Sequence, residues 1–299
     1  HLTDALDASE SLITLGLQLG VDSPGSVFQS VIGEAIAATG IDWLLLPHLF
    51  DHYAGWLIDA VRPLGCIQLA LIHYDLIPLV FSDQYLRGQR YAHFYRESLN
   101  YLSEFDCIAS ISEFSKVDLD RHFPDLTARS VAIGTGVDQS RFQIKSGKGE
   151  FATNTPERML LCAPSGFDYR KNVEGFLSVY SLLSETIRET YPLYLVGRVG
   201  EPEYAKLYRV CEKLGIVHQV KFCGFVDDDV LIELYQNAAC FVFPSIYEGF
   251  GLPALEAVLC GCPTLAANGS SLPEVLGEGN GLVDPNDYDS WARAIELLL

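Results

Sequence analysis

The chain has 299 residues, of which 49% are hydrophobic, and a formal net charge of −19 at pH 7. So acidic a surface repels nucleic acid and anionic lipid, which argues against both as partners. The length exceeds that of one compact core, and the sequence contains no apolar run long enough to span a membrane.

Strand and helix patterns alternate through the first half of the chain. Residues 27–38 carry apolar side chains at helical spacing. Four apolar runs indicate buried strands, at residues 42–47, 66–73, 106–112 and 130–133. Strands that alternate with helices are typical of a parallel, doubly wound sheet, so the first half predicts an α/β, Rossmann-like lobe.

A polar, glycine-rich stretch at residues 145–156 separates this half from a second series of strands that begins near Met159. The sequence therefore predicts two domains, residues 1–150 and residues 151–299, each an α/β lobe with a parallel sheet. Ligands of such sheets bind at the carboxyl ends of the strands, so we expect the functional site in a cleft between the lobes.

The most informative segment follows the strand predicted at residues 240–244. Gly249 and Gly251 lack a Cβ atom, so the backbone here can turn sharply and approach a ligand closely. Pro253 suits the first turn of the helix that follows. Unpaired amides at the start of a helix favour an anion, and phosphate is the anion that we expect at this turn.

Two carboxylates flank this turn. Glu256 lies about one turn into the predicted helix, where its oxygens can accept hydrogen bonds from ribose hydroxyls. Glu248 precedes the turn, nearer to where a sugar attached to the phosphate would sit. The alternative is a glycine-rich turn with two solvated glutamates, which a lone Glu-Gly-X-Gly segment allows equally well.

An anionic ligand needs local cations in a chain this acidic. Arg170 and Lys171 are the best candidates, because a guanidinium presents a planar fork to phosphate and an ammonium presents a point charge. The alternative is an ordinary exposed basic pair that binds no ligand.

Metal ligands are not expected. Asp227, Asp228 and Asp229 precede a predicted helix, where capping and the helix dipole explain them. His48 and His52 lack a convincing set of acidic or cysteine partners. The chain has 8 cysteines, scattered without a Cys-X-X-Cys pair, which indicates buried thiols in a reducing cytosol.

Taken in order, these segments resemble the retaining glycosyltransferases of the GT-B fold, family 4. Glu248 and Glu256, with seven residues between them, match the pair of glutamates that marks the family. Residues 166–172 resemble its Arg-Lys-Asn segment, which binds the donor phosphate. Further matches follow the family's order through the second half, at residues 194–197, 220–226, 231–235, 270–275 and 281–285.

The first half resembles one branch of this family, the bacterial polysaccharide mannosyltransferases. The matching segments are residues 43–50, 72–79 and 111–116. Many members have a histidine directly before the aspartate of the second segment, whereas this chain has Tyr74 there and His73 one place earlier. Side chains alternate along a strand, so these two should face opposite ways, and the sequence leaves open which of them enters the site.

The resemblance implies a metal-independent, retaining hexosyltransferase of polysaccharide biosynthesis, with two lobes that face a cleft. Its donor would be a nucleoside diphosphate sugar, with GDP-mannose favoured by analogy, its acceptor a glycan or glycolipid, and it would need no other cofactor. The catalytic residues would be Glu248 at the donor sugar, with His73 and Asp75 on the acceptor side. The donor-binding residues would be Gly166, Arg170, Lys171, Gly249, Phe250, Gly251, Leu252 and Glu256.

Two alternatives stay open. One is a sugar-nucleotide epimerase of the same fold, against which the spacing of the two glutamates argues. The other is a non-catalytic sugar-nucleotide-binding or scaffold subunit. The chain starts at His1 without the glycine-rich loop that begins the family's first domain, so we expect an incomplete first lobe and a longer polypeptide. We also expect a cytoplasmic protein without stable membrane insertion, peripheral to the inner face of the membrane only through segments outside this chain.

Overall fold

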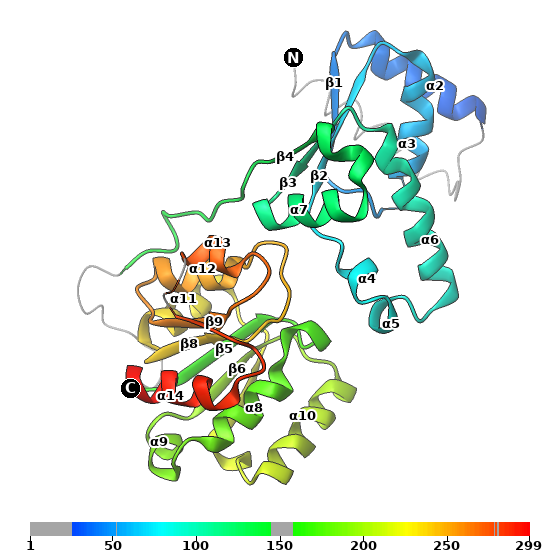
Figure 1. The fold of residues 1–299 in the computed structure, drawn as a ribbon. Coiled ribbons are helices and arrows are strands. Elements are labelled where there is room, and N and C mark those ends of the chain that lie inside the picture. The colour runs from blue at the N-terminus through cyan, green and yellow to red at the C-terminus, as the bar shows by residue number, and fades with distance from the viewer. Residues whose placement is uncertain (1–25, 52, 145–157, 278, 280) are drawn as a thin grey trace. The chain divides into compact units, whose positions relative to one another are not determined.

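The computed structural model describes residues 26–51, 53–144, 158–277, 279 and 281–299. Internal contacts divide the chain into two compact units, His1–Gly134 and Thr135–Leu299. Each unit is built on a parallel sheet of its own, with helices connecting the strands (Figure 1).

The boundary between the units lies earlier than the predicted division between residues 150 and 151. Phe142 is buried in the core of the second unit, and Arg141 Nη1 lies 2.9 Å from Asp228 Oδ2 of the same unit. These contacts attach the segment before the predicted linker to the second unit. The linker itself, residues 145–156, lies outside the described residues.

The first unit has a four-stranded sheet in the order β1-β2-β3-β4. A helical connection precedes each of the last three strands, which is why all the pairings are parallel. The elements are α2 (Ser26–Ala38), β1 (Trp43–Leu46), α3 (Ala54–Val61), η1 (Arg62–Leu64), β2 (Gln68–His73), α4 (Ile77–Val80), α5 (Ser82–Tyr85), α6 (Gln89–Asn100), η2 (Tyr101–Glu104), β3 (Cys107–Ser110), α7 (Glu113–His122), η3 (Pro124–Arg129) and β4 (Ser130–Ala132).

Asp106 fixes the start of β3 against the start of β2. Its Oδ2 accepts hydrogen bonds from Arg62 Nη1 at 2.8 Å and from Leu69 N at 3.0 Å. The hydrogen bond from Arg62 is the main reason why the pKa of the Asp106 carboxyl is lowered. Tyr95 and Phe105 are fully buried in the core of the first unit.

The second unit has a six-stranded parallel sheet in the order β10-β9-β8-β5-β6-β7. Its elements are β5 (Leu160–Ser165), η4 (Tyr169–Lys171), α8 (Val173–Leu182), α9 (Glu185–Thr190), β6 (Leu193–Gly197), α10 (Glu201–Leu214), η5 (Val217–Gln219), β7 (Val220–Gly224), α11 (Asp228–Asn237), β8 (Cys240–Phe243), α12 (Leu252–Leu259), β9 (Thr264–Ala267), α13 (Leu272–Leu276), β10 (Leu282–Val283) and α14 (Tyr288–Leu298).

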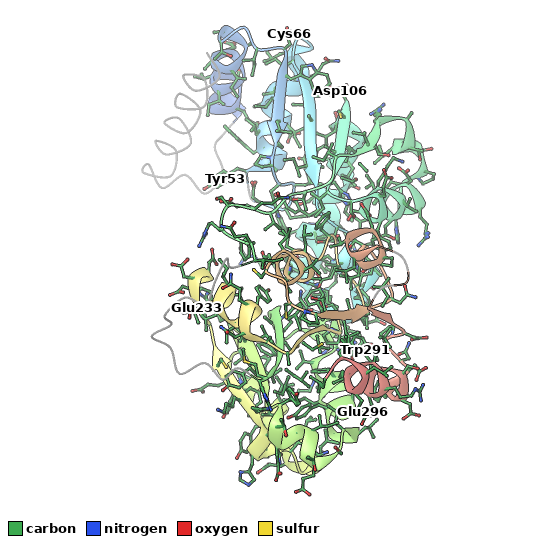
Figure 2. The ribbon with its side chains drawn as sticks, turned by 90° about the vertical axis from the view of Figure 1, so that its left-hand side faces the viewer. Tyr53, Cys66, Asp106, Glu233, Trp291 and Glu296 are labelled. Atoms are coloured by element: carbon green, nitrogen blue, oxygen red, sulfur yellow. The ribbon has the colours of Figure 1, made fainter. Side chains whose placement is uncertain are left out.

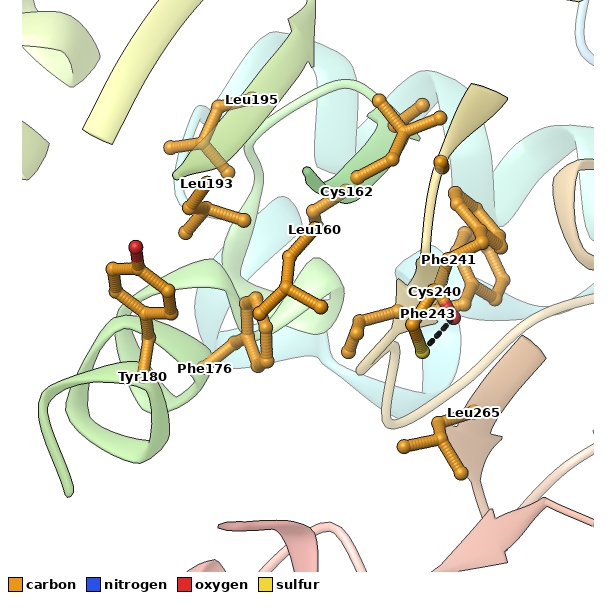
Figure 3. Close-up of a cluster of buried hydrophobic side chains, with 14 of the residues drawn as sticks. Leu160, Cys162, Phe176, Tyr180, Leu193, Leu195, Cys240, Phe241, Phe243 and Leu265 are labelled. Carbon is orange, nitrogen blue, oxygen red and sulfur yellow. Dashed lines mark hydrogen bonds between the residues drawn. The ribbon is translucent and has the colours of Figure 1, made fainter. Parts of the chain in front are cut away.

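The core of the second unit surrounds its two central strands, β5 and β8 (Figure 3). All four residues of β8 are buried, as expected for a parallel strand with helices on both faces. On α14, Trp291 is buried and its ring lies 6.4 Å from that of Phe176 on α8, whereas Glu296 is exposed (Figure 2). Burying aromatic side chains of this size is worth about 1.5–3 kcal/mol each.

The structure confirms the helix and the four strands predicted in the first half, although each strand is shorter than its apolar run. The strands of the described first sheet follow chain order, so the strand-order reversal of a doubly wound sheet is present only in the second sheet. All eight cysteines are free thiols, and five of them are buried. Within residues 26–299, those described include no helix that is both long enough and apolar enough to cross a membrane.

Candidate functional site

The predicted donor-binding residues follow the two strands at which the strand order of the second sheet reverses. The chain leaves β5 toward β6 and β7, and it leaves β8 toward β9 and β10 on the other side. Because β5 and β8 are parallel neighbours, the loops after them leave from the same edge of the sheet. In open α/β sheets, this switch point is where ligands bind.

The loop after β5 ends in the short helix η4 and then in Asn172, whose φ of 51° is left-handed. Asn172 is well suited to that conformation, which larger L-residues avoid. The loop is joined to the one after β8 by a backbone hydrogen bond of 2.8 Å from Ile246 N to Arg170 O. The two loops therefore form one connected structure at the switch point.

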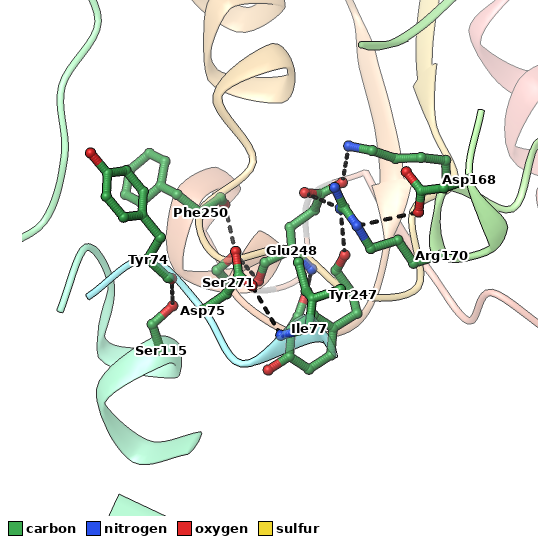
Figure 4. A network of polar contacts seen from close by, with 12 residues as sticks. Tyr74, Asp75, Ile77, Ser115, Asp168, Arg170, Tyr247, Glu248, Phe250 and Ser271 are labelled. Carbon is green, nitrogen blue, oxygen red and sulfur yellow. Dashed lines mark hydrogen bonds and ion pairs between the residues drawn. The ribbon is translucent and has the colours of Figure 1, made fainter. Parts of the chain in front are cut away.

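Glu248 lies between the two predicted phosphate-binding cations (Figure 4). Its Oε2 is 2.6 Å from Arg170 Nη1, and its Oε1 is 2.6 Å from Lys171 Nζ. Arg170 Nη1 also donates to Tyr247 O at 3.0 Å, and Arg170 Nε lies 3.4 Å from Asp168 Oδ1. The structure thus brings Glu248, Arg170 and Lys171 together in one charged cluster.

This cluster is shielded from water. Lys171 is 5% exposed and Glu248 is 7% exposed. Burial lowers the pKa of the Lys171 ammonium, and the charge of Glu248 opposes that effect. An ammonium that has lost most of its hydration gains strongly from an anionic partner, and in this structure the partner of Lys171 is Glu248.

Two serines that the sequence analysis assigned no role support the backbone of Glu248. Ser270 Oγ accepts a hydrogen bond from Glu248 N at 2.9 Å. Ser271 Oγ lies 3.1 Å from Glu248 O and 2.7 Å from Phe250 O, and Ser271 is fully buried. The match of residues 270–275 to the family was a signal for this region, but it did not identify these contacts.

Gly251 is the N-cap of α12, with a left-handed φ of 103°. A Cβ atom on Gly251 would lie 2.6 Å from Leu272 Cδ2. Both the backbone conformation and the close approach of α13 therefore require glycine at this position. Pro253 occupies the first turn of α12, as predicted.

Glu256 projects from α12 beside α11. Its Oε2 accepts a hydrogen bond from Tyr235 Oη at 3.3 Å. Burial is the main reason why the pKa of the Glu256 carboxyl is raised, and the nearby charge of Asp228 raises it further. A partly buried carboxylate with one neutral partner can accept hydrogen bonds from further hydroxyl groups.

The acidic run at the start of α11 caps that helix, as predicted, with Asp227 as the N-cap and Asp228 and Asp229 in the first turn. Asp227 Oδ1 accepts a hydrogen bond from Val230 N at 2.9 Å. Elsewhere, His48 Nδ1 accepts a hydrogen bond from Phe50 N at 2.9 Å, and His52 lies outside the described residues. The part of the chain that the structure describes holds no group of three or more His, Cys, Asp or Glu side chains suited to a metal ion.

His73, Tyr74 and Asp75 line a cavity of about 250 Å³ in the first unit. His73 is 4% exposed and Tyr74 is 46% exposed, in keeping with the alternation expected at the end of β2. His73 Nδ1 lies 3.2 Å from Ser110 Oγ, and Tyr74 O accepts from Ser115 Oγ at 2.8 Å. Asp75 Oδ1 accepts from Ile77 N at 2.9 Å (Figure 4), so Asp75 also stabilises the start of α4.

Comparison with known proteins adds to this picture. A family model described as "Glycosyl transferases group 1" matches residues 148–299, which is more than half of the chain. The serotype-specific mannosyltransferase WbdA of Escherichia coli is 34% identical over 234 residues, which are 76% of this chain and 28% of WbdA. The O-antigen chain mannosyltransferase B of Escherichia coli is 44% identical over 126 residues, which are 42% of this chain and 33% of that protein.

Among solved structures, HepE of Anabaena in complex with UDP and glucose matches with a TM-score of 0.72 at 18% identity. The match covers 92% of this chain and 74% of that chain, and at this identity it shows the fold alone. The chain spans 28% of the length of WbdA and 33% of the length of the O-antigen chain mannosyltransferase B.

Proposed function

The chain belongs to the glycosyl transferases group 1 family and has the GT-B fold, and from that premise we propose that it transfers a hexosyl group. The donor is a nucleoside diphosphate sugar, and the acceptor is a glycan or glycolipid of polysaccharide biosynthesis. The single observation that carries this proposal is the cluster of Arg170, Lys171 and Glu248 at the switch point of the second sheet.

The cluster fits a diphosphate because it places two cations beside a glycine turn and a helix start. When the donor binds, its diphosphate becomes a partner of Arg170 and Lys171, in competition with the carboxylate of Glu248. The amides of Gly249, Phe250, Gly251 and Leu252 add hydrogen-bond donors to the same anion. Charge-assisted hydrogen bonds of this kind are about twice as strong as neutral ones.

The released carboxylate of Glu248 then accepts hydrogen bonds from hydroxyl groups of the donor sugar. Glu256 accepts hydrogen bonds from the ribose hydroxyls, in addition to the one that it already accepts from Tyr235. The family model covers both glutamates, which supports these two roles.

The reaction breaks the bond between the anomeric carbon of the sugar and the diphosphate oxygen, and it forms a bond from that carbon to an acceptor hydroxyl oxygen. The acceptor proton leaves with the diphosphate. Arg170 and Lys171 stabilise the negative charge that grows on the leaving phosphate, a contribution of about 3–4 kcal/mol for each well-placed donor. These two cations supply the positive charge that a metal ion supplies in other transferases, so we propose a metal-independent reaction.

We further propose that the configuration of the anomeric carbon is retained, through attack from the face that the diphosphate leaves. The resemblance of residues 248–256 to retaining enzymes supports this stereochemistry. GDP-mannose is the proposed donor, because the two curated relatives are named mannosyltransferases.

A thermal-shift screen with GDP-mannose, UDP-glucose, GDP and UDP tests the donor first. A nucleotide sugar that binds the folded chain raises the melting temperature with concentration. Transfer is then measured in EDTA with a panel of mannosides as acceptors, and NMR of the product gives its anomeric configuration. If no nucleotide sugar raises the melting temperature or is consumed, the proposal is wrong. Epimerised donor without transfer would indicate the epimerase, and binding without turnover would indicate a scaffold subunit.

A further inference from the structure

Tyr235 lies in the last turn of α11 and contacts Glu256 on the neighbouring helix α12. Tyr235 is fully buried, whereas Glu256 is only partly buried. The Tyr235 hydroxyl donates to Glu256 Oε2 at 3.3 Å. The carboxylate therefore has a protein partner toward the core and still reaches solvent. The resemblance of residues 231–235 to the family assigned Tyr235 no role.

The Tyr235 hydroxyl acts toward Glu256 as a donor. Burial raises the pKa of this hydroxyl well above its usual range, and the charge of Glu256 raises it further, so the hydroxyl stays protonated. A buried hydroxyl that loses its partner costs roughly 1–3 kcal/mol, which favours the conformer of Glu256 that keeps the bond. A carboxylate has about four acceptor sites, so one bond to Tyr235 leaves others for the hydroxyl groups of a ligand.

The ring of Tyr235 is held in place by the core of the second unit. It meets the ring of Phe241 edge to face, with centroids 5.2 Å apart and ring planes at 89°. Phe241 stacks on Phe243 at 5.9 Å, as expected for residues two positions apart on one face of a strand (Figure 3). All three rings are fully buried. A ring packed in this way has little freedom to move, so the sheet sets the position of the Tyr235 hydroxyl.

The same row of rings reaches the phosphate-binding half of the candidate site. Lys171 Nζ lies 5.4 Å from the centroid of the Phe243 ring. The proposed phosphate cation and the proposed ribose carboxylate thus adjoin opposite ends of one buried row, made of Phe243, Phe241 and Tyr235. Groups supported by rigid, packed elements hold a ligand more precisely than groups on unsupported loops.

We propose that Tyr235 is a positioning residue, whose hydroxyl orients the carboxylate of Glu256 toward the ribose and so gives the site a preference for ribonucleotides. This inference rests on the proposed function, in which Glu256 binds the ribose hydroxyls. A site built to bond a hydroxyl discriminates against an analogue that lacks it, and the discrimination depends on how well the acceptor is placed. Tyr235 acts through Glu256, so the packing of its ring alone does not supply this preference.

Isothermal titration calorimetry with GDP and UDP, each compared with its 2′,3′-dideoxy analogue, tests the proposal. The parent chain should bind the tighter of the two ribonucleotides at least about tenfold more tightly than its analogue, as expected for hydrogen bonds to a charged group. Tyr235→Phe keeps the ring and removes the hydroxyl. It should reduce that preference by roughly threefold or more, through weaker binding of the ribonucleotide, while the dideoxy analogue binds as before.

Tyr180→Phe is the matched control. Tyr180 is also fully buried in the second unit, but its hydroxyl donates to backbone oxygens, among them Tyr191 O at 3.1 Å. This variant should lose stability and keep the preference for the ribonucleotide. If Tyr235→Phe does not fold by circular dichroism, Tyr235→Met takes its place, because methionine also lacks the hydroxyl and fills irregular gaps.

A second measurement needs no nucleotide. NMR titration of the glutamate side-chain carboxyls, assigned with Glu256→Gln, follows the pKa of Glu256. The Tyr235 hydroxyl lowers this pKa against the effects of burial and of Asp228, so Tyr235→Phe should raise it. Tyr180→Phe should leave it unchanged. The pKa of the nearby Cys260 thiol is raised to about 11 by burial, so that thiol stays neutral throughout the titration.

Three results would overturn the proposal: an equal preference for the ribonucleotide in Tyr235→Phe and the parent chain, no such preference in the parent chain, or an unchanged pKa of Glu256 in Tyr235→Phe. In each of them the chain still binds nucleotide. Failure of the proposed function is distinct, because neither GDP nor UDP would bind, and the positioning role would then be wrong as well.

Discussion

Lys171 Nζ lies 2.6 Å from Glu248 Oε1, although the two residues are 77 positions apart in the sequence. Each residue was a separate candidate in the sequence, one for the phosphate and one for the sugar. In the structure they are partners, with Arg170 as a third member. A ligand that binds one of them therefore changes the surroundings of the other.

Lys171→Met should lower the rate of donor turnover by roughly 100-fold or more, because one charge-stabilising donor is lost from the transition state. It should also lower the free energy of unfolding by about 1–3 kcal/mol, because Glu248 stays buried with one cation fewer. Steady-state kinetics and urea denaturation measure the two effects.

The control for this variant is Lys206→Met. Lys206 pairs with Glu174 on the surface, where its side chain is 65% exposed. An exposed pair is worth about 0–1 kcal/mol, so turnover should not change and stability should change little. Equal turnover in Lys171→Met and Lys206→Met would rule out the proposed role of Lys171.

Glu256→Gln should make the fold more stable at pH 7 while it weakens nucleotide binding. The pKa of Glu256 is raised in the folded state, mainly by burial, so the folded chain binds more protons than the unfolded chain around the ordinary carboxyl pKa of 4.5. Stability therefore falls as pH rises through that window, and the ionised carboxylate is a net penalty above it. Removing the charge should therefore raise the free energy of unfolding at pH 7.

Thermal melts of Glu256→Gln between pH 4 and pH 8 check this sign. The gain over the parent chain should vanish at the acidic end, where both carry a neutral side chain. Glu296→Gln on the exposed face of α14 is the control and should give no gain. A loss of stability at pH 7 in Glu256→Gln would contradict the prediction.

Gly251→Ala should destabilise the second unit by about 1–3 kcal/mol, because its left-handed φ of 103° and the nearby Leu272 both oppose a Cβ atom. Gly215→Ala is a matched control, since Gly215 also has a left-handed φ, of 69°, but nothing lies within 4 Å of an added Cβ. That variant should lose about 1 kcal/mol. Chemical denaturation of both variants gives the difference between their free energies of unfolding. Equal losses would show that the contact with Leu272 does not add to the cost of the left-handed backbone.

His73 should make the first unit less stable as pH falls. Its pKa is about 4 in the folded state because of burial and 6.5 in the reference state, so only the unfolded chain takes up the proton between these values. Stability should then decline by about 3 kcal/mol as pH falls from 6.5 to 4. Hydrogen exchange of the backbone amides of β2 measures the stability of the first unit separately from that of the second unit.

His73→Gln should flatten that decline, because glutamine does not titrate. His218→Gln replaces an exposed histidine of the second unit and should leave the slope at β2 unchanged. An unchanged slope in His73→Gln would show that other groups cause the acid sensitivity.

The secondary structure was predictable because it depends on local pattern. The run of apolar residues at 240–243 and Pro253 after it are the local signals for β8 and for the start of α12. The two cations and two glutamates of the candidate donor site could be named from their resemblance to the family. Their roles in binding the donor stay predictions.

Contacts across the sheet were not predictable in the same way. The pairing of Glu248 with Lys171 depends on β5 lying next to β8, and strand order is a property of the whole sheet. Ser270 and Ser271 reach Glu248 only because α13 packs beside α12. The domain boundary was placed too late because Phe142 finds its core partners far along the chain.

The backbone bond from Ile246 to Arg170 has a consequence for how the protein acquires its site during folding. The residues before Ala239 include Arg170 and Lys171, but the carboxylate of the charged cluster, Glu248, arrives only after β8. Closing a loop of that length is slow relative to local structure formation. A nascent chain that stops before Cys240 lacks Glu248 and Glu256 and should therefore respond to no nucleotide sugar.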